Sequence, residues 1–133
     1  MCYTYNAGGA VPSPHVPMLV VFPSTAEEVS RIVGFCNSNG ISIVPRAQGS
    51  GLSVNAVCES AHSIILSLQR MQSIVIEPET LTAVAGAGAI TADIKKAAAG
   101  HGLMYPPDPA SCAFSSIGGN VATDAGGLQC VKY

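Results

Sequence analysis

The chain has 133 residues, of which 48% are hydrophobic and only 11% are charged, and its formal net charge at pH 7 is -2. Six basic residues do not supply the positive surface that nucleic-acid binding requires, so a nucleic-acid partner is excluded. The length suits one modest domain or two small subdomains. Because soluble domains average about 25% charged residues, we expect a large ligand or another domain to cover part of this surface.

The first 26 residues carry no charge, but prolines interrupt them and they contain no basic stretch, which does not fit a signal peptide. The apolar run at residues 18–22 is too short to cross a membrane. The five cysteines have long, irregular spacings, and the three histidines share no metal-ligand spacing. We therefore expect a cytoplasmic protein with free thiols, no transmembrane segment and no metal site.

The first elements predict a strand–helix–strand unit. Residues 18–22 form a short apolar run that is typical of a buried strand. Thr25 and Glu28 fit a capping box at the start of a helix with apolar residues at helical spacing, and Gly40 ends it. Residues 41–44 form the next strand, so the unit has the size of a βαβ crossover.

A glycine loop, residues 45–55, follows this second strand with the sequence Pro-Arg-Ala-Gln-Gly-Ser-Gly-Leu-Ser-Val-Asn. Gly49 and Gly51 permit a positive φ, successive N–H groups in such a loop bind anions, and Arg46 adds a charge. Ligands of parallel sheets bind at the carboxyl ends of strands, where this loop lies. Spacing alone leaves an anion-binding loop and a plain turn equally open. A nucleoside-triphosphate loop is excluded, because no Gly-Lys-Ser/Thr follows.

The pattern then changes. Residues 63–68 are a third strand candidate, and we place a subdomain boundary near residues 70–73. Residues 73–77 and 81–85 alternate around a short Pro-Glu-Thr turn, which predicts an antiparallel hairpin.

Residues 86–91, Gly-Ala-Gly-Ala-Ile-Thr, follow the hairpin and partly match the dinucleotide fingerprint. Thr91 replaces the third glycine, and no acidic residue stands about 20 residues later at a strand end. We interpret the segment as a tight turn in which Thr91 caps a helix that runs to about residue 99. A nicotinamide-dinucleotide site is the alternative.

Two further motifs lie in the last third of the chain. Residues 106–111, Pro-Pro-Asp-Pro-Ala-Ser, form either a surface turn capped by Asp108 or a rigid wall beside a planar ligand. Residues 115–127 hold two Gly-Gly pairs among small residues, a backbone that a large ligand can approach closely. The alternative is a flexible linker, which Ile117 and Val121 disfavour.

Taken in order, these segments resemble the N-terminal FAD-binding domain of the FAD-linked oxidases, the fold shared by vanillyl-alcohol oxidase and para-cresol methylhydroxylase. The sequence is most similar to the branch that contains glycolate oxidase and D-lactate dehydrogenase. The resemblance implies an α+β fold of FAD-binding type 2. Its small βαβ subdomain would occupy residues 1–70, and the incomplete start of a second, antiparallel subdomain residues 71–133. It rests on residues 21–29, 45–53, 88, 106–109 and 117–127.

The resemblance implies a flavoprotein oxidoreductase that oxidises a 2-hydroxy acid of the glycolate or D-lactate type by hydride transfer to FAD. It places the pyrophosphate on the first loop, and the ribityl and flavin parts along the last segment. It nominates no catalytic residue. The implied cofactor-binding residues are Pro45, Arg46, Ala47, Gln48, Gly49, Ser50, Gly51, Leu52, Pro107, Asp108, Ser111, Ser116, Gly118, Gly119, Asn120, Ala122, Thr123, Gly126 and Gly127.

Two residues depart from the family pattern. Ala47 stands where the family usually has glycine, and alanine costs about 1 kcal/mol or more if that position needs a positive φ. Ser50 stands where some relatives carry a histidine bonded to the flavin, so we expect non-covalent FAD.

The family's domain continues well beyond residue 127, and a separate domain binds the substrate. We therefore expect a truncated chain that has no turnover alone and binds FAD weakly or not at all. Partner subunits of an oxidase complex, which would hold it at the inner membrane face, fit this family. The alternatives are another superfamily member, such as an alcohol or sugar-acid oxidase or an NADPH-dependent UDP-sugar reductase, or a non-catalytic dinucleotide-binding module.

Overall fold

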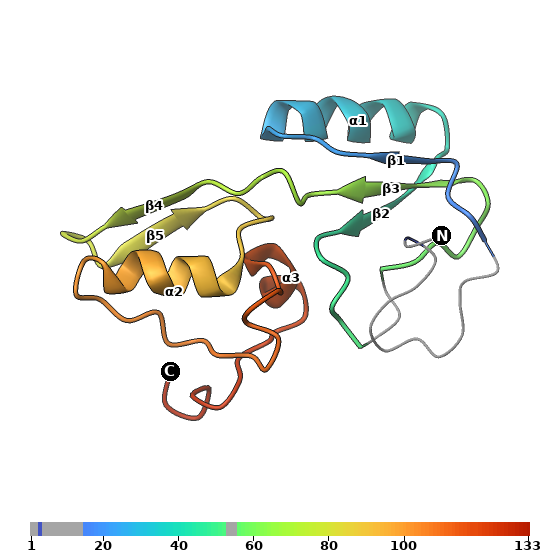
Figure 1. The fold of residues 1–133 in the computed structure, drawn as a ribbon. Coiled ribbons are helices and arrows are strands. Elements are labelled where there is room, and N and C mark those ends of the chain that lie inside the picture. Colours follow the sequence, from blue (N-terminus) through green and yellow to red (C-terminus); the bar gives the residue numbers. More distant parts are fainter. Residues whose placement is uncertain (1–2, 4–14, 53–55) are drawn as a thin grey trace.

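The computed structural model describes Tyr3, residues 15–52 and residues 56–133 (Figure 1). Strands and helices build two units, a parallel sheet with one helix and an antiparallel hairpin with another. The strands are β1 (Leu19–Val21), β2 (Ser42–Arg46), β3 (Ser63–Ser67), β4 (Ile74–Glu77) and β5 (Thr82–Ala85). The helices are α1 (Ala26–Ser38), α2 (Thr91–Ala99) and α3 (Ile117–Ala122).

The parallel sheet has the strand order β1-β3-β2. In the central strand β3 every residue is buried, and Ile65 pairs with Val20 of β1 and Val44 of β2. The predicted strand–helix–strand unit is confirmed, but β3 lies between its two strands. The second strand is also longer than predicted, because Pro45 and Arg46 still pair with β3. Proline is tolerated there because β2 is an edge strand, where one backbone N–H is not needed.

Helix α1 begins where the sequence predicts. Thr25 is its N-cap, and the Thr25 side chain accepts a hydrogen bond from the Glu28 N–H at 3.2 Å. The Glu28 carboxylate accepts from the Ser24 N–H at 2.7 Å, one residue before the N–H that a regular capping box uses. Gly40 follows the helix with a φ of 65°, a conformation that favours glycine.

The second unit begins with the predicted hairpin. Strands β4 and β5 are antiparallel, with Val75 opposite Val84. Helix α2 packs on the hairpin and buries Ile94 and Ala98 (Figure 1). The expectation that Thr91 caps α2 is wrong, because Ile90 is the N-cap and makes no side-chain cap hydrogen bond. Thr91 is instead the first helical residue and is fully buried.

Helix α3 was not predicted, because its Gly-Gly pair is unfavourable in a helix. Ser116 caps it by accepting a hydrogen bond from the Gly119 N–H at 3.4 Å. Gly118 lies against the turn between β5 and α2, where its N–H donates to the Ala87 carbonyl at 3.0 Å. A Cβ on Gly118 would come within 2.7 Å of that oxygen. Tertiary packing, rather than local propensity, therefore places a helix here.

The described ranges contain four cysteines, Cys36, Cys58, Cys112 and Cys130, and no disulfide joins any two of them. Within the same ranges, no helix combines the length and the apolar character that crossing a membrane would need.

We predict that Gly118→Ala lowers the free energy of unfolding by about 1–3 kcal/mol, because the added methyl group collides with the backbone at Ala87. Gly34→Ala in α1 is the matched control. A Cβ on Gly34 would meet nothing within 4 Å, so that change should raise the free energy of unfolding by about 0.5–1 kcal/mol. Urea denaturation of both variants measures the effect. If Gly118→Ala and the wild type had equal free energies of unfolding, the contact between α3 and Ala87 would not stabilise the fold.

Candidate functional site

A cavity of about 480 Å³ lies between the loop that follows β2 and the region of α3. All the cofactor-binding residues predicted in the first loop, residues 45–52, line it, together with most of those predicted in the later segment. Residues 53–55 of the predicted loop lie outside the described residues. The lining residues are Pro45, Arg46, Ala47, Gln48, Gly49, Ser50, Gly51, Leu52, Ala56, Ser111, Ser116, Gly119, Asn120, Ala122, Thr123 and Ala125. The two glycine segments, about 70 residues apart in the sequence, thus form two walls of one cavity.

Residues 47–52 line the first wall of the cavity. None of their backbone N–H groups donates a hydrogen bond to another residue in the described part of the chain. The loop is held at its start, where the Leu68 N–H donates to the Arg46 carbonyl at 2.8 Å. Backbone donors in folded proteins are rarely left without an acceptor, and a run of them in a curved loop binds anions. This wall is therefore suited to an anionic ligand.

Arg46 supports this loop. Its Nη1 donates a hydrogen bond to the Ala56 carbonyl at 2.8 Å, and its guanidinium lies 5.5 Å from the centre of the Tyr3 ring. Gly49 has a φ of 68°, and a Cβ there would overlap the Arg46 guanidinium. Among the described residues that line the cavity, Arg46 alone carries a formal charge. The cavity is therefore positive, and no carboxylate in its described lining offsets that charge.

Ala47, which stands where the family usually has glycine, does not have the positive φ that would strain an alanine. In the described part of the chain, the non-glycine residues with a positive φ are Leu81 and Asp124, and Ala47 is not among them. The alanine methyl group instead faces the second wall, because a Cβ on Gly119 would lie 3.9 Å from the Ala47 Cβ. The expected cost of alanine at this position therefore does not apply.

The second wall is polar and well packed. Ser116 is 1% exposed and Asn120 is 7% exposed. The Asn120 side-chain nitrogen donates to the Thr91 hydroxyl at 2.6 Å, so the cavity wall is tied to the first turn of α2.

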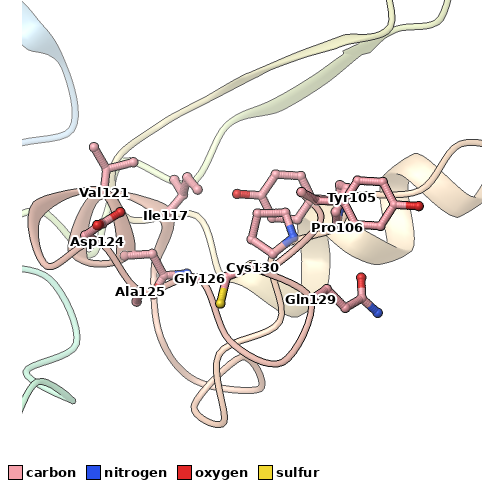
Figure 2. A pocket seen from close by; sticks show the side chains of 12 residues that line it. Tyr105, Pro106, Ile117, Val121, Asp124, Ala125, Gly126, Gln129 and Cys130 are labelled. Carbon is pink, nitrogen blue, oxygen red and sulfur yellow. The ribbon is translucent and has the colours of Figure 1, made fainter.

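A second cavity, also of about 480 Å³, adjoins the first and shares Asn120 and Ala125 with it. Of the other predicted residues, Pro107 and Gly126 lie here. Figure 2 shows Tyr105 and Pro106 on one side of this cavity and Asp124 and Ala125 on the other, with Cys130 between them. Partial burial raises the pKa of Tyr105, so its hydroxyl stays protonated as a hydrogen-bond donor.

Three predicted residues line neither of these cavities. Asp108 pairs with Lys95 at 2.5 Å, and the hydrogen bond and the charge of Lys95 hold the pKa of Asp108 below its usual value. Gly127, with a φ of 82°, lies against the Asp108 carbonyl, and Gly118 lies against Ala87. The structure shows packing contacts for these three, and their contact with a cofactor stays a prediction.

The segment 86–91 is used for packing. The Gly88 N–H donates to the Met71 carbonyl at 2.8 Å, and a Cβ on Gly88 would overlap the Leu68 carbonyl. Gly86 is close to Met71 in the same way. These contacts support the interpretation of this segment as a tight turn, rather than as a nicotinamide-dinucleotide site.

Sequence reasoning missed Ala56 and Ala125 in the lining, and small apolar residues give no signal for such a role. It also missed Thr91, whose hydroxyl contacts Asn120 from beneath the cavity wall. In the described residues, no group of three or more histidine, cysteine, aspartate or glutamate side chains is placed to hold a metal ion.

A parallel three-stranded sheet, an antiparallel hairpin and a cavity lined by two glycine segments define a flavin-binding domain of the para-cresol methylhydroxylase type. The sequence model of the family described as "FAD binding domain" matches residues 17–133, and the chain belongs to that family. FAD is accordingly its cofactor.

Curated relatives agree with this assignment. The chain is 37% identical to glycolate oxidase subunit GlcD of Bacillus subtilis over 134 positions, which cover 100% of the chain and 28% of the relative. It is 38% identical to D-lactate dehydrogenase of Archaeoglobus fulgidus over 115 positions, or 86% of the chain and 26% of the relative. The chain thus spans about a quarter of the length of these relatives.

The fold also matches a solved structure of alkyldihydroxyacetonephosphate synthase with a TM-score of 0.79 and 27% sequence identity. The match covers 86% of this chain and 23% of that one.

We predict that Gly49→Ala weakens FAD binding and Gly40→Ala does not. Both glycines have a positive φ, so each substitution should cost about 1 kcal/mol of folding stability. The new methyl group at position 49 also displaces the Arg46 guanidinium, whereas one at position 40 meets nothing within 4 Å. Flavin fluorescence titration with urea denaturation separates the two effects. Equal FAD affinity in the two variants would remove Arg46 and its loop from the cofactor site.

Proposed function

We propose that this chain is the FAD-binding part of a flavoprotein oxidoreductase that oxidises a 2-hydroxy acid. The observation that carries the proposal is the run of N–H groups at residues 47–52. They have no acceptor among the described residues, and Arg46 is the only charged residue in the described lining of the cavity. The names of two relatives, glycolate oxidase subunit GlcD and D-lactate dehydrogenase, support the substrate class.

The described residues fit an FAD molecule. In this proposal the loop at residues 47–52 and Arg46 hold the pyrophosphate, because backbone donors and a guanidinium suit phosphate oxygens. Gly119, Asn120 and Thr123 lie along the ribityl part, where the glycine lets the ligand approach the backbone. The isoalloxazine ring extends toward the second cavity, beyond Asn120. The two cavities share this residue and Ala125, which supports one continuous ligand path.

Bound FAD supplies the hydride acceptor, and the chain supplies binding and orientation. Ser50 lies in the cavity lining, which contains no histidine or cysteine among its described residues. This composition supports non-covalent attachment at the loop.

We also propose that residues 1–70 and 71–133 form two subdomains. The cofactor lies between the loop of the first subdomain and α3 of the second. No described residue is assigned as the general base. The groups that bind the substrate carboxylate and take the hydroxyl proton belong to the additional length that the relatives have. The proposed location is the cytoplasm, where partner subunits attach the protein to the membrane surface.

The sequence alone predicts that this chain binds FAD weakly or not at all. Because described residues form both walls of the cavity, we instead expect the chain itself to bind FAD saturably and in preference to NAD and ADP. Arg46→Gln should weaken FAD binding about tenfold, because it removes a charged hydrogen-bond donor. Arg31→Gln, on the exposed side of α1, is the matched control and should leave the affinity unchanged. Equilibrium titration measures these affinities. Acid precipitation of the complex should release all the flavin.

Preference for NAD over FAD would contradict the proposal and favour a nicotinamide site. Equal FAD affinity in the Arg46→Gln and Arg31→Gln variants would contradict the assigned anion site. Flavin retained on the acid pellet would contradict non-covalent attachment alone.

A further inference from the structure

We infer that Thr91 is a positioning residue of the cofactor site, because its hydroxyl fixes the orientation of the Asn120 amide. The inference rests on the proposed function and concerns a residue outside both glycine segments. Thr91 is 0% exposed and stands 29 positions before Asn120 in the sequence. It lines neither of the two cavities that meet at Asn120.

The hydrogen bonds around Thr91 have a definite direction. Its Oγ1 lies 3.1 Å from the Ser115 carbonyl oxygen, which can only accept. The Thr91 Oγ1 also lies 3.3 Å from the Ser115 Oγ, and either of these two atoms can donate. The single hydroxyl proton of Thr91 therefore goes to one of the two Ser115 oxygens. The Thr91 oxygen is left as an acceptor, and the Asn120 Nδ2 donates to it at 2.6 Å.

This direction decides which edge of the Asn120 amide is available. The nitrogen edge is turned to Thr91, so the carbonyl oxygen lies on the opposite edge of the same planar group. Because Asn120 lines both cavities, it offers a bound ligand an acceptor. The ligand group that suits this acceptor is a donor, such as a hydroxyl of a ribityl chain or the N–H of a flavin ring.

The surroundings of Thr91 make this orientation rigid. The Thr91 backbone N–H donates to the Ser115 carbonyl at 3.0 Å, and the Ile117 N–H donates to the Ala89 carbonyl at 2.9 Å. These bonds tie the start of α2 to the segment that leads into α3. The Thr91 hydroxyl does not cap α2, so helix formation does not explain a buried polar group here. A buried hydroxyl is favourable only when it is hydrogen-bonded, and its partners are Ser115 and Asn120.

The test compares Thr91→Val, which keeps the shape and removes the hydroxyl, with Thr91→Ser, which keeps the hydroxyl. We expect Thr91→Val to weaken FAD binding about tenfold and Thr91→Ser to retain the wild-type affinity. In the apo protein, the side-chain NH₂ resonances of Asn120 should be protected from solvent exchange. Thr91→Val should remove that protection, and Thr91→Ser should keep it. Thr82→Val, at an exposed position of the hairpin, is the control for a threonine-to-valine change.

The outcomes distinguish failure of the inference about Thr91 from failure of the proposed function. If the wild type binds FAD and Thr91→Val binds it equally well, the inference is overturned and the proposed function stands. If the wild type does not bind FAD, the proposed function fails, and the Asn120 resonances alone decide whether Thr91 orients the amide. If Thr91→Val does not fold, the wild type still gives the answer. A nuclear Overhauser effect from the Asn120 NH₂ to the Thr91 methyl group supports the orientation, and its absence overturns it.

Discussion

The hydrogen bond from Arg46 to the Ala56 carbonyl holds the loop on which the whole site depends. Arg46 is the last residue of β2, so the buried central strand β3 fixes its backbone, and its side chain returns across Gly49. Gly49 adopts a left-handed conformation against that side chain, where a Cβ would overlap the guanidinium. The N–H groups of residues 47–52 next to it have no acceptor in the described chain. An arginine that merely added charge could be replaced by lysine, but one that also braces the loop cannot.

The second wall depends on a close backbone approach of another kind. Gly118 lets α3 contact Ala87, and the buried Thr91, Ser115 and Asn120 fasten the helix to α2. The cavity therefore has one wall from the parallel sheet and one from the hairpin unit. The first wall continues from the end of β2 and the second includes α3, so regular elements position both walls. Glycines serve different purposes in the two segments: some line the cavity, and others, such as Gly118 and Gly127, make room for backbone.

Local signals in the sequence sufficed for α1, with its Thr25 cap, and for the hairpin of β4 and β5. The glycine pattern marked the loop after β2 as a candidate anion site, and the resemblance to the FAD-linked oxidases supplied the residues of both walls. The position of β3 between β1 and β2 depends on tertiary pairing and leaves no local trace. Helix α3 contradicts the low helix propensity of its glycines, and Thr91 resembles an ordinary cap in sequence. The φ of Ala47 depends on how the whole loop closes, so the sequence did not reveal that alanine is unstrained there.

The central claim is that the N–H groups at residues 47–52 receive the pyrophosphate of FAD. Amide chemical shifts recorded during an FAD titration of the isotope-labelled chain test this claim most directly. We predict large shifts for residues 47–52 and for Gly119 and Asn120, and small ones for Gly86 and Gly88. Shifts confined to Gly86 and Gly88, with residues 47–52 unchanged, would contradict it.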